Sequence, residues 1–161
     1  MRSGLSRRAL LANAAALSTL AAGCASATTN AASNSDALGA SDGVGLASRI
    51  RAGEITASEA MEAAIARADR VNPELNFIVT PLYDVGRARA REALNGPFAG
   101  VPTLIKDLLD WTGHPTKFGS RAFAGNVSRQ QPPYMDALLA GGVVPFGKST
   151  TPEFGFTATT E

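Results

Sequence analysis

Cysteine and histidine are almost absent from this chain of 161 residues, which has one of each, Cys24 and His114. A single cysteine excludes a disulfide within the chain, and one cysteine with one histidine is too small a set for a zinc site. The net charge is only +1, so no strong positive field attracts nucleic acid or acidic lipid. We therefore expect neither a metal centre nor a nucleic-acid partner. The remaining composition, 45% hydrophobic and 18% charged, is typical of a globular protein with one core.

Residues 1–23 have the organisation of a signal peptide. Arg2, Arg7 and Arg8 precede an uncharged stretch, 9–23, that is rich in alanine and leucine. A basic start before an apolar segment of this length is typical of secretion and is short for a membrane span. The adjacent arginines resemble a twin-arginine signal, and an ordinary Sec signal is the alternative. We therefore expect an exported protein of the periplasm or cell envelope.

The end of the signal, Leu20-Ala21-Ala22-Gly23-Cys24, resembles a bacterial lipobox. Cleavage before Cys24 would leave this residue at the N-terminus, where a lipid could anchor the chain to a membrane. Ala21 departs from the leucine that is usual at its position, so a conventional cleavage site beside a free thiol is the alternative. We expect the lipid-anchored form.

Residues 24–43 predict a flexible linker. After Cys24 this segment consists mainly of Ala, Ser, Thr, Asn and Gly, with almost no large apolar residue. Such a segment buries too little surface to offset the entropy lost on ordering. We expect a folded domain to begin near Val44 and to occupy 44–161.

Helical and strand patterns alternate along 44–161, and this alternation predicts the α/β class. The signals are apolar residues at helical spacing, short apolar runs, and capping or turn residues between them. They predict a short helix ending at Gly53, a helix from the capping box Thr56–Glu59 to Pro73, a strand at 76–80, a helix from Pro81 to about Leu94, a strand-like run at 103–109, a helix from Pro132-Pro133 to Gly141-Gly142, a strand at 143–147 and a helix start at 150–153.

A lysine lies inside one of the apolar runs. Lys106 follows Leu104 and Ile105 and precedes Asp107 and another leucine pair. Taken alone, such a lysine predicts a strand end whose aliphatic stem covers apolar neighbours while the ammonium reaches water. The motifs around it favour a different interpretation.

Two segments carry a family resemblance. Residues 96–107 read Gly-Pro-Phe-Ala-Gly-Val-Pro-Thr-Leu-Ile-Lys-Asp, and residues 147–155 read Gly-Lys-Ser-Thr-Thr-Pro-Glu-Phe-Gly. With the intervening glycines at 113, 119 and 141–142, they resemble the N-terminal third of the amidase signature family, over roughly 46–161. The resemblance implies an α/β fold with a mixed central sheet flanked by helices, of which this chain carries the N-terminal part. The motif around Lys106 is similar to that of cyclic amide-oligomer hydrolases in the family.

The family resemblance implies hydrolysis of a carboxamide by a serine nucleophile, with a bridging serine on a cis peptide bond and a lysine as the base. Lys106 matches that lysine, and the implied partner is a small amide substrate, without metal or organic cofactor. A lysine accepts a proton only when neutral, and burial favours the neutral amine by lowering its pKa from about 10.4. We expect Leu104, Ile105, Leu108 and Leu109 to provide that apolar environment.

Other polar residues near the motifs have less chemical significance. Lys148 is expected to have a structural part. Asp107 is expected to be a structural cap, and the alternative is a residue that positions nearby backbone or restrains the lysine. His114 lies in a Gly-His-Pro turn that predicts an exposed loop. Trp111 and Phe118 could line a substrate pocket or pack in the interior.

In the family, the bridging serine and the nucleophile lie in a Gly-Gly-Ser-Ser-Gly-Gly type region and in a second Gly/Ser-rich stretch after it, and neither is present in the 161 residues. Ser120, Ser128 and Ser149 lack this glycine context and are not expected to be nucleophiles. We interpret the chain as a fragment that is inactive alone. The alternative is a non-catalytic exported lipoprotein or binding module derived from an amidase.

Overall fold

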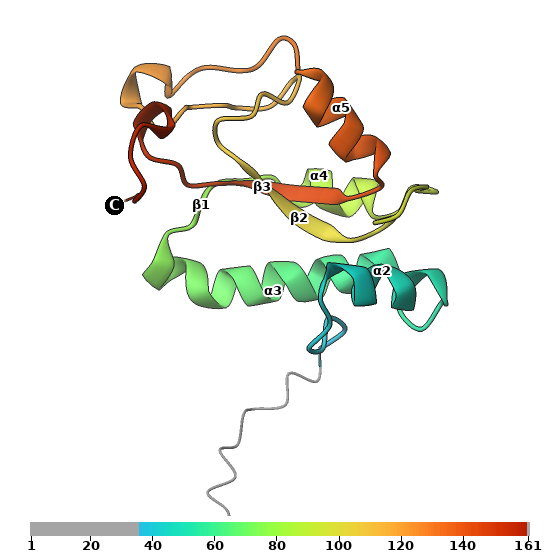
Figure 1. The fold of residues 1–161 in the computed structure, drawn as a ribbon. Helices are drawn as coiled ribbons and strands as arrows, with labels where there is room; N and C mark the ends of the chain where they lie inside the picture. The colour runs from blue at the N-terminus through green and yellow to red at the C-terminus, as the bar shows by residue number, and fades with distance from the viewer. Residues whose placement is uncertain (1–35, 161) are drawn as a thin grey trace, which may run out of the picture. The chain divides into compact units, whose positions relative to one another are not determined.

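The structure is a computed structural model that describes residues 36–160. The expected signal peptide at 1–23, Cys24 and most of the expected linker lie outside the described residues. Within 36–160 the chain forms a three-stranded mixed sheet with helices packed against it (Figure 1). None of the helices in this part of the chain has the length and apolarity needed to cross a membrane.

The sheet has β3 at its centre. The strands are β1 (Ile78–Pro81), β2 (Pro102–Lys106) and β3 (Val144–Ser149), and the helices are α2 (Gly43–Arg51), α3 (Ala57–Leu75), α4 (Tyr83–Arg89) and α5 (Pro133–Ala140). β3 pairs antiparallel with β1 and parallel with β2, which leaves β2 at an edge among the described residues. The expected α/β class with a mixed sheet is therefore confirmed.

Helices cover both faces of this sheet. α3 packs against β1 and β3 through a cluster that contains Met61, Ile65, Ile78 and Phe146. On the opposite side, α5 packs against β2 (Figure 1), where Met135 contacts the cluster of Ile105 and Trp111. Burial of each large apolar side chain contributes about 1.5–3 kcal/mol, so these two layers hold β2 and β3 in place.

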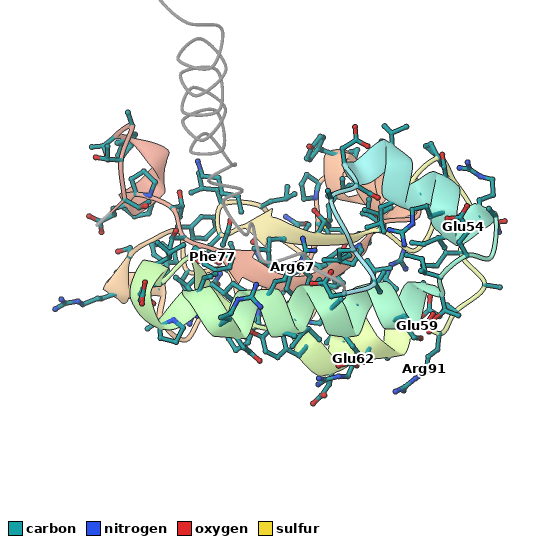
Figure 2. All side chains as sticks on the ribbon, turned by 90° about the horizontal axis from the view of Figure 1, so that it is seen from below. Glu54, Glu59, Glu62, Arg67, Phe77 and Arg91 are labelled. Atoms are coloured by element: carbon teal, nitrogen blue, oxygen red, sulfur yellow. The ribbon has the colours of Figure 1, made fainter. Side chains whose placement is uncertain are left out.

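Residues 36–43 are folded, so the expected boundary at Val44 lies too late. The Asp36 carboxylate accepts hydrogen bonds from the backbone N–H groups of Leu38 and Gly39 at 3.1 and 3.2 Å. Arg67, in the middle of α3 (Figure 2), donates to both oxygens of the same carboxylate at 2.6 and 2.7 Å. A local turn and a two-pronged ion pair thus order a segment that has few apolar residues.

α3 begins as expected and ends later than expected. Thr56 and Glu59 form the predicted capping box. Pro73 lies inside the helix, which continues to Leu75 and ends at Asn76 in the left-handed conformation, with φ of 48°. A proline removes one backbone hydrogen bond, and with only one half-turn remaining that loss is small enough for the helix to continue. The Asn72 side chain also accepts from Ile78 N at 2.8 Å and joins α3 to β1.

Several other elements are shorter than predicted. The helix expected up to Leu94 ends at Arg89. The apolar run at 103–109 is a strand only to Lys106, beyond which the chain turns. The expected helix start at 150–153 yields only the short 3-10 turn Glu153–Gly155. These ends depend on tertiary contacts that the local pattern does not contain.

Glycines position the start of β2. Gly142 has a φ of +86°, and a Cβ on it would lie 2.5 Å from Asn95 O. Phe98 N donates to Gly141 O, and Gly100 N donates to Gly142 O, both at 2.9 Å. The turn before β2 is therefore clamped to the turn before β3, so the two strands begin in register.

The ion pair at Asp36 gives the first prediction. Hydrogen bonding to Arg67 holds the pKa of the Asp36 carboxyl below its ordinary value of 3.8. Such a group adds stability above its unfolded pKa, and that stability is lost as the pH falls through the lowered folded pKa. Because both side chains keep nearly a third of their surface exposed, Asp36→Ala should lower the free energy of unfolding by only about 1 kcal/mol at pH 7.

Urea denaturation followed by circular dichroism at pH 7 and below pH 3 measures this effect. The difference between the variant and the parent chain should shrink at the lower pH. An Asp42→Ala variant, which removes only the α2 cap, serves as the control without an arginine partner. Equal effects of Asp36→Ala at both pH values would rule out the ion pair as the cause.

Candidate active site

Lys106 is the last residue of β2, and its side chain is exposed in the described chain. Its neighbour Ile105 is 1% exposed and packs in the core beneath α5. Because side chains alternate across a strand, Lys106 does not share the buried position of Ile105 and reaches the surface. The expectation that the surrounding leucines bury Lys106 is therefore wrong for this part of the chain.

An open, largely apolar hollow lies beside Lys106. Its walls come from β2, from the turn that follows β2, and from α5. They are formed by Thr103, Leu104, Ile105, Lys106, Leu108, Leu109, Tyr134 and Leu138. The lysine is thus the one charged side chain on a surface that is otherwise suited to an apolar group.

The turn after Lys106 is fixed by hydrogen bonds. Leu109 N donates to Lys106 O at 2.9 Å, and Asp107 N donates to Ser149 O at 3.0 Å. The Asp107 carboxylate, which is 1% exposed, accepts from Lys117 N at 3.2 Å through each oxygen. Asp107 therefore holds a loop against the end of β2, in keeping with a structural cap.

The buried lysine of this structure is Lys148, on β3. It pairs with Ile105 of β2 and is completely buried. Its Nζ donates to Leu109 O at 2.6 Å and to Thr116 Oγ1 at 3.0 Å, and it lies 3.8 Å from Asp107 Oδ1. The ammonium thus lies directly beneath the turn that carries Lys106.

The polar network continues from Lys148 into the loop after Asp110. The Thr116 and Ser128 hydroxyls are 2.8 Å apart, and Ser128 Oγ donates to the Asp110 carboxylate at 2.5 Å. Thr116 is completely buried and Ser128 is 5% exposed, so neither hydroxyl is open to a substrate. A lysine next to a hydroxyl resembles a catalytic pair, but here its burial makes it a structural network.

Burial governs the electrostatics of this network. It lowers the pKa of Lys148, against the opposing attraction of Asp107 and Asp110. It also raises the pKa of Asp107, although the hydrogen bond from Lys117 N and the charge of Lys148 oppose that change. At 3.8 Å the attraction between the two charges does not fully compensate the loss of hydration.

The remaining predicted residues take structural places. Trp111 is 8% exposed and packs in the core, and the His114 ring contacts it at a tilt of 45° with ring centres 4.0 Å apart. His114 is half-buried rather than an exposed loop residue, and burial lowers its pKa. The hydroxyl of Ser120 caps the turn at Arg121–Phe123. Among the described residues, Lys106 has no hydrogen bond to any serine hydroxyl.

The sequence pattern did not reveal the network of Lys148, Thr116 and Ser128. The available signal was that Lys148 directly follows the apolar run 143–147, so a buried strand could be expected to include it. Its partners are 32 and 39 positions away, beyond the reach of local patterns. Across 36–160, no three side chains of the His, Cys, Asp or Glu types come together as metal ligands.

Comparison with known proteins places this arrangement in a family. The Amidase family profile matches residues 59–161, which include Lys106, the turn after it and Lys148. The chain belongs to the amidase family. The hollow beside Lys106 is therefore the candidate active site of an amidase domain, of which the described residues form one part.

Individual relatives agree with this assignment. AmiC of Mycobacterium leprae is 42% identical over 118 residues, which cover 73% of this chain and 25% of that protein. The 6-aminohexanoate-cyclic-dimer hydrolase of Paenarthrobacter ureafaciens is 37% identical over 118 residues, covering 71% and 24%. The chain thus spans about a quarter of the length of the curated relatives that it matches.

Solved structures show the same fold. The structure of a 6-aminohexanoate cyclic dimer hydrolase complexed with substrate matches with a TM-score of 0.71 and 35% identity, over 75% of this chain and 26% of that one. A bacterial aryl acylamidase of the amidase signature family matches with a TM-score of 0.70 and 26% identity, covering 75% and 27%. The partial amidase signature fold expected from the sequence is confirmed.

The buried cation gives a prediction for stability. Lys148→Met keeps most of the side-chain volume but leaves the Asp107 carboxylate buried without its cation. Breaking a buried pair from one side should lower the free energy of unfolding by about 3–5 kcal/mol. The double variant Lys148→Met/Asp107→Asn should recover most of this loss, because no unpaired charge remains.

Urea denaturation of the 161-residue chain measures these changes. Lys117→Met is the matched control: it removes a more distant charge that also attracts Asp107, but the Lys117 side chain makes no hydrogen bond or ion pair within 36–160 and its backbone N–H is retained. A Lys148→Met variant as stable as Lys117→Met would show that the buried contacts of Lys148 add nothing.

Proposed function

We propose that Lys106 is the general base of an amidase that hydrolyses a carboxamide through a serine nucleophile. The observation that carries this proposal is the place of Lys106 at the end of an edge strand, beside an open hollow, in a chain that belongs to the amidase family. The serines are supplied by polypeptide that is not among the described residues.

The proposed reaction begins with proton transfer. Neutral Lys106 takes a proton from a bridging serine as that serine takes one from the nucleophilic serine, whose oxygen attacks the amide carbon. The nitrogen–carbon bond breaks, the amine leaves with a returned proton, and water hydrolyses the acyl-enzyme. Backbone N–H groups stabilise the oxyanion. In this proposal, polypeptide outside the described residues covers Lys106 and excludes water from it.

The hollow supports an amide substrate with an apolar part. Leucine side chains from β2, the following turn and α5 line the hollow beside Lys106. The similarity to a hydrolase of a cyclic amide dimer supports a substrate of that class, linear or cyclic. The apolar wall would hold the methylene groups while the amide carbon lies near the lysine and the serines.

The 161-residue chain alone should not hydrolyse amides or esters, because it lacks the Gly-Gly-Ser-Ser-Gly-Gly type region. The measurement is turnover of an amide and ester panel that includes 6-aminohexanoate cyclic dimer. Replacing the matched quarter of the Paenarthrobacter hydrolase with this chain's residues 36–160 gives a fusion enzyme, which should regain turnover. In it, Lys106→Met should lower kcat by about 10³-fold or more.

Lys117→Met is the control in the fusion enzyme and should retain activity. Two outcomes would contradict the proposal. One is turnover by the 161-residue chain that Lys106→Ala abolishes, which would make the chain catalytically complete. The other is a folded, active fusion enzyme that keeps its kcat after Lys106→Met, which would remove Lys106 from the chemistry.

The second candidate is a non-catalytic exported lipoprotein or binding module derived from an amidase. It is favoured by the missing serine region, and both candidates would carry the lipobox-like sequence that ends at Cys24. The nucleotide sequence downstream of the Glu161 codon separates the two candidates. A continuing frame with a Gly-Gly-Ser-Ser-Gly motif supports the enzyme, and a stop codon followed by unrelated sequence supports the second candidate.

A further inference from the structure

We propose that Lys148 is a positioning residue for Lys106, because its ammonium fixes the turn from which Lys106 projects. This inference rests on the proposed function of Lys106 as the base. It assigns to a second lysine a role in the same site, through the backbone and without contact with the substrate.

The first link is a pair of consecutive hydrogen bonds. Lys148 Nζ donates to Leu109 O at 2.6 Å, and Leu109 N donates to Lys106 O at 2.9 Å. The short length of the first bond is typical of a charge-assisted interaction. The ammonium is therefore joined to the backbone of Lys106 through a single intervening residue.

The second link runs through Asp107, the residue directly after Lys106. Its carboxylate lies 3.8 Å from Lys148 Nζ, and its backbone N–H donates to Ser149 O on β3. Lys148 is also on β3, one residue before Ser149, and its ammonium contacts the turn at Asp107 and at Leu109. Within the turn 106–109, β3 therefore holds the second residue, Asp107, and the fourth, Leu109.

An apolar side chain could fill this space with less desolvation. Buried ion pairs can often be replaced by packed hydrophobic residues without loss of stability. Lys148 instead keeps three donors in the interior, of which two bond Leu109 O and Thr116 Oγ1. This directional arrangement fixes the turn in one geometry, which undirected apolar packing would not do.

The geometry of the turn matters because it sets the direction of Lys106. β2 lies at an edge among the described residues, so its last residue is held by β3 on one side only. A displacement of about 1 Å at a catalytic group can reduce the rate about 100-fold. The contacts of Lys148 thus add to the pairing with β3 in holding this strand end.

The double variant Lys148→Met/Asp107→Asn separates positioning from stability. It removes the bond to Leu109 O while leaving no unpaired buried charge, so the fold should survive. In the 161-residue chain, hydrogen exchange by NMR should show the Leu109 amide exchanging at least about tenfold faster than in the parent, relative to the amides of α3. The Lys106 backbone resonances should shift as well.

In the fusion enzyme, the same double variant should lower kcat about 10- to 100-fold with little change in KM, whereas Lys117→Met should lower neither. On the unmodified chain, the Lys148 ammonium should give a slowly exchanging NMR signal, which tests the bond even if the variants unfold. Unchanged protection of Leu109 relative to α3, an unaltered kcat or a rapidly exchanging Lys148 ammonium would each overturn the proposal.

The two proposals fail in different ways. If Lys106 is not the base, Lys106→Met leaves the kcat of the fusion enzyme intact while Leu109 protection still depends on Lys148. If Lys148 does not position the turn, Lys106→Met remains inactivating while the double variant keeps both Leu109 protection and kcat.

Discussion

The buried ammonium of Lys148 is the interaction on which the local structure of the candidate site depends. It lies where β3 passes beneath the end of β2, and it bonds Leu109 O in the turn and Thr116 Oγ1 in the loop that follows. Desolvation opposes the charge, as the lowered pKa of Lys148 indicates. The hydrogen bonds and ion pair of Lys148 partly offset this desolvation, and they connect the end of β2, the turn after it and the loop that contains Thr116.

The exposure of Lys106 follows from the same arrangement. Ile105 faces the core, so Lys106 faces away from it, and the turn after it is drawn toward β3 by Asp107. We propose different roles for the two lysines: Lys148 is buried and organises the backbone, whereas Lys106 is exposed beside an apolar hollow. If Lys106 is the base, polypeptide outside the described residues would have to cover the edge of β2 and exclude water from Lys106.

Local signals in the sequence predicted local structure well. The capping box at Thr56 and Glu59 and the glycine turn after α5 are read from adjacent residues, and both are present. The folded state of 36–43 depends on Arg67, which is 31 positions from Asp36. The residues next to Asp36 therefore could not predict that this segment is folded. The site divides in the same way: the motif predicts Lys106 as the base, which stays a prediction, whereas the burial of each lysine depends on loops distant in sequence.

Family membership and geometry make the hollow beside Lys106 the candidate site within the described chain. The amidase profile covers both lysines, and relatives four times as long as the matched segment share its fold. The most direct measurement of the central claim is the distance from Lys106 Nζ to the nearest serine Oγ in a crystal structure of the fusion enzyme. The account predicts a hydrogen bond of about 2.6–3.2 Å in a site closed to bulk water. A Lys106 ammonium in open solvent, without a serine within reach, would contradict it.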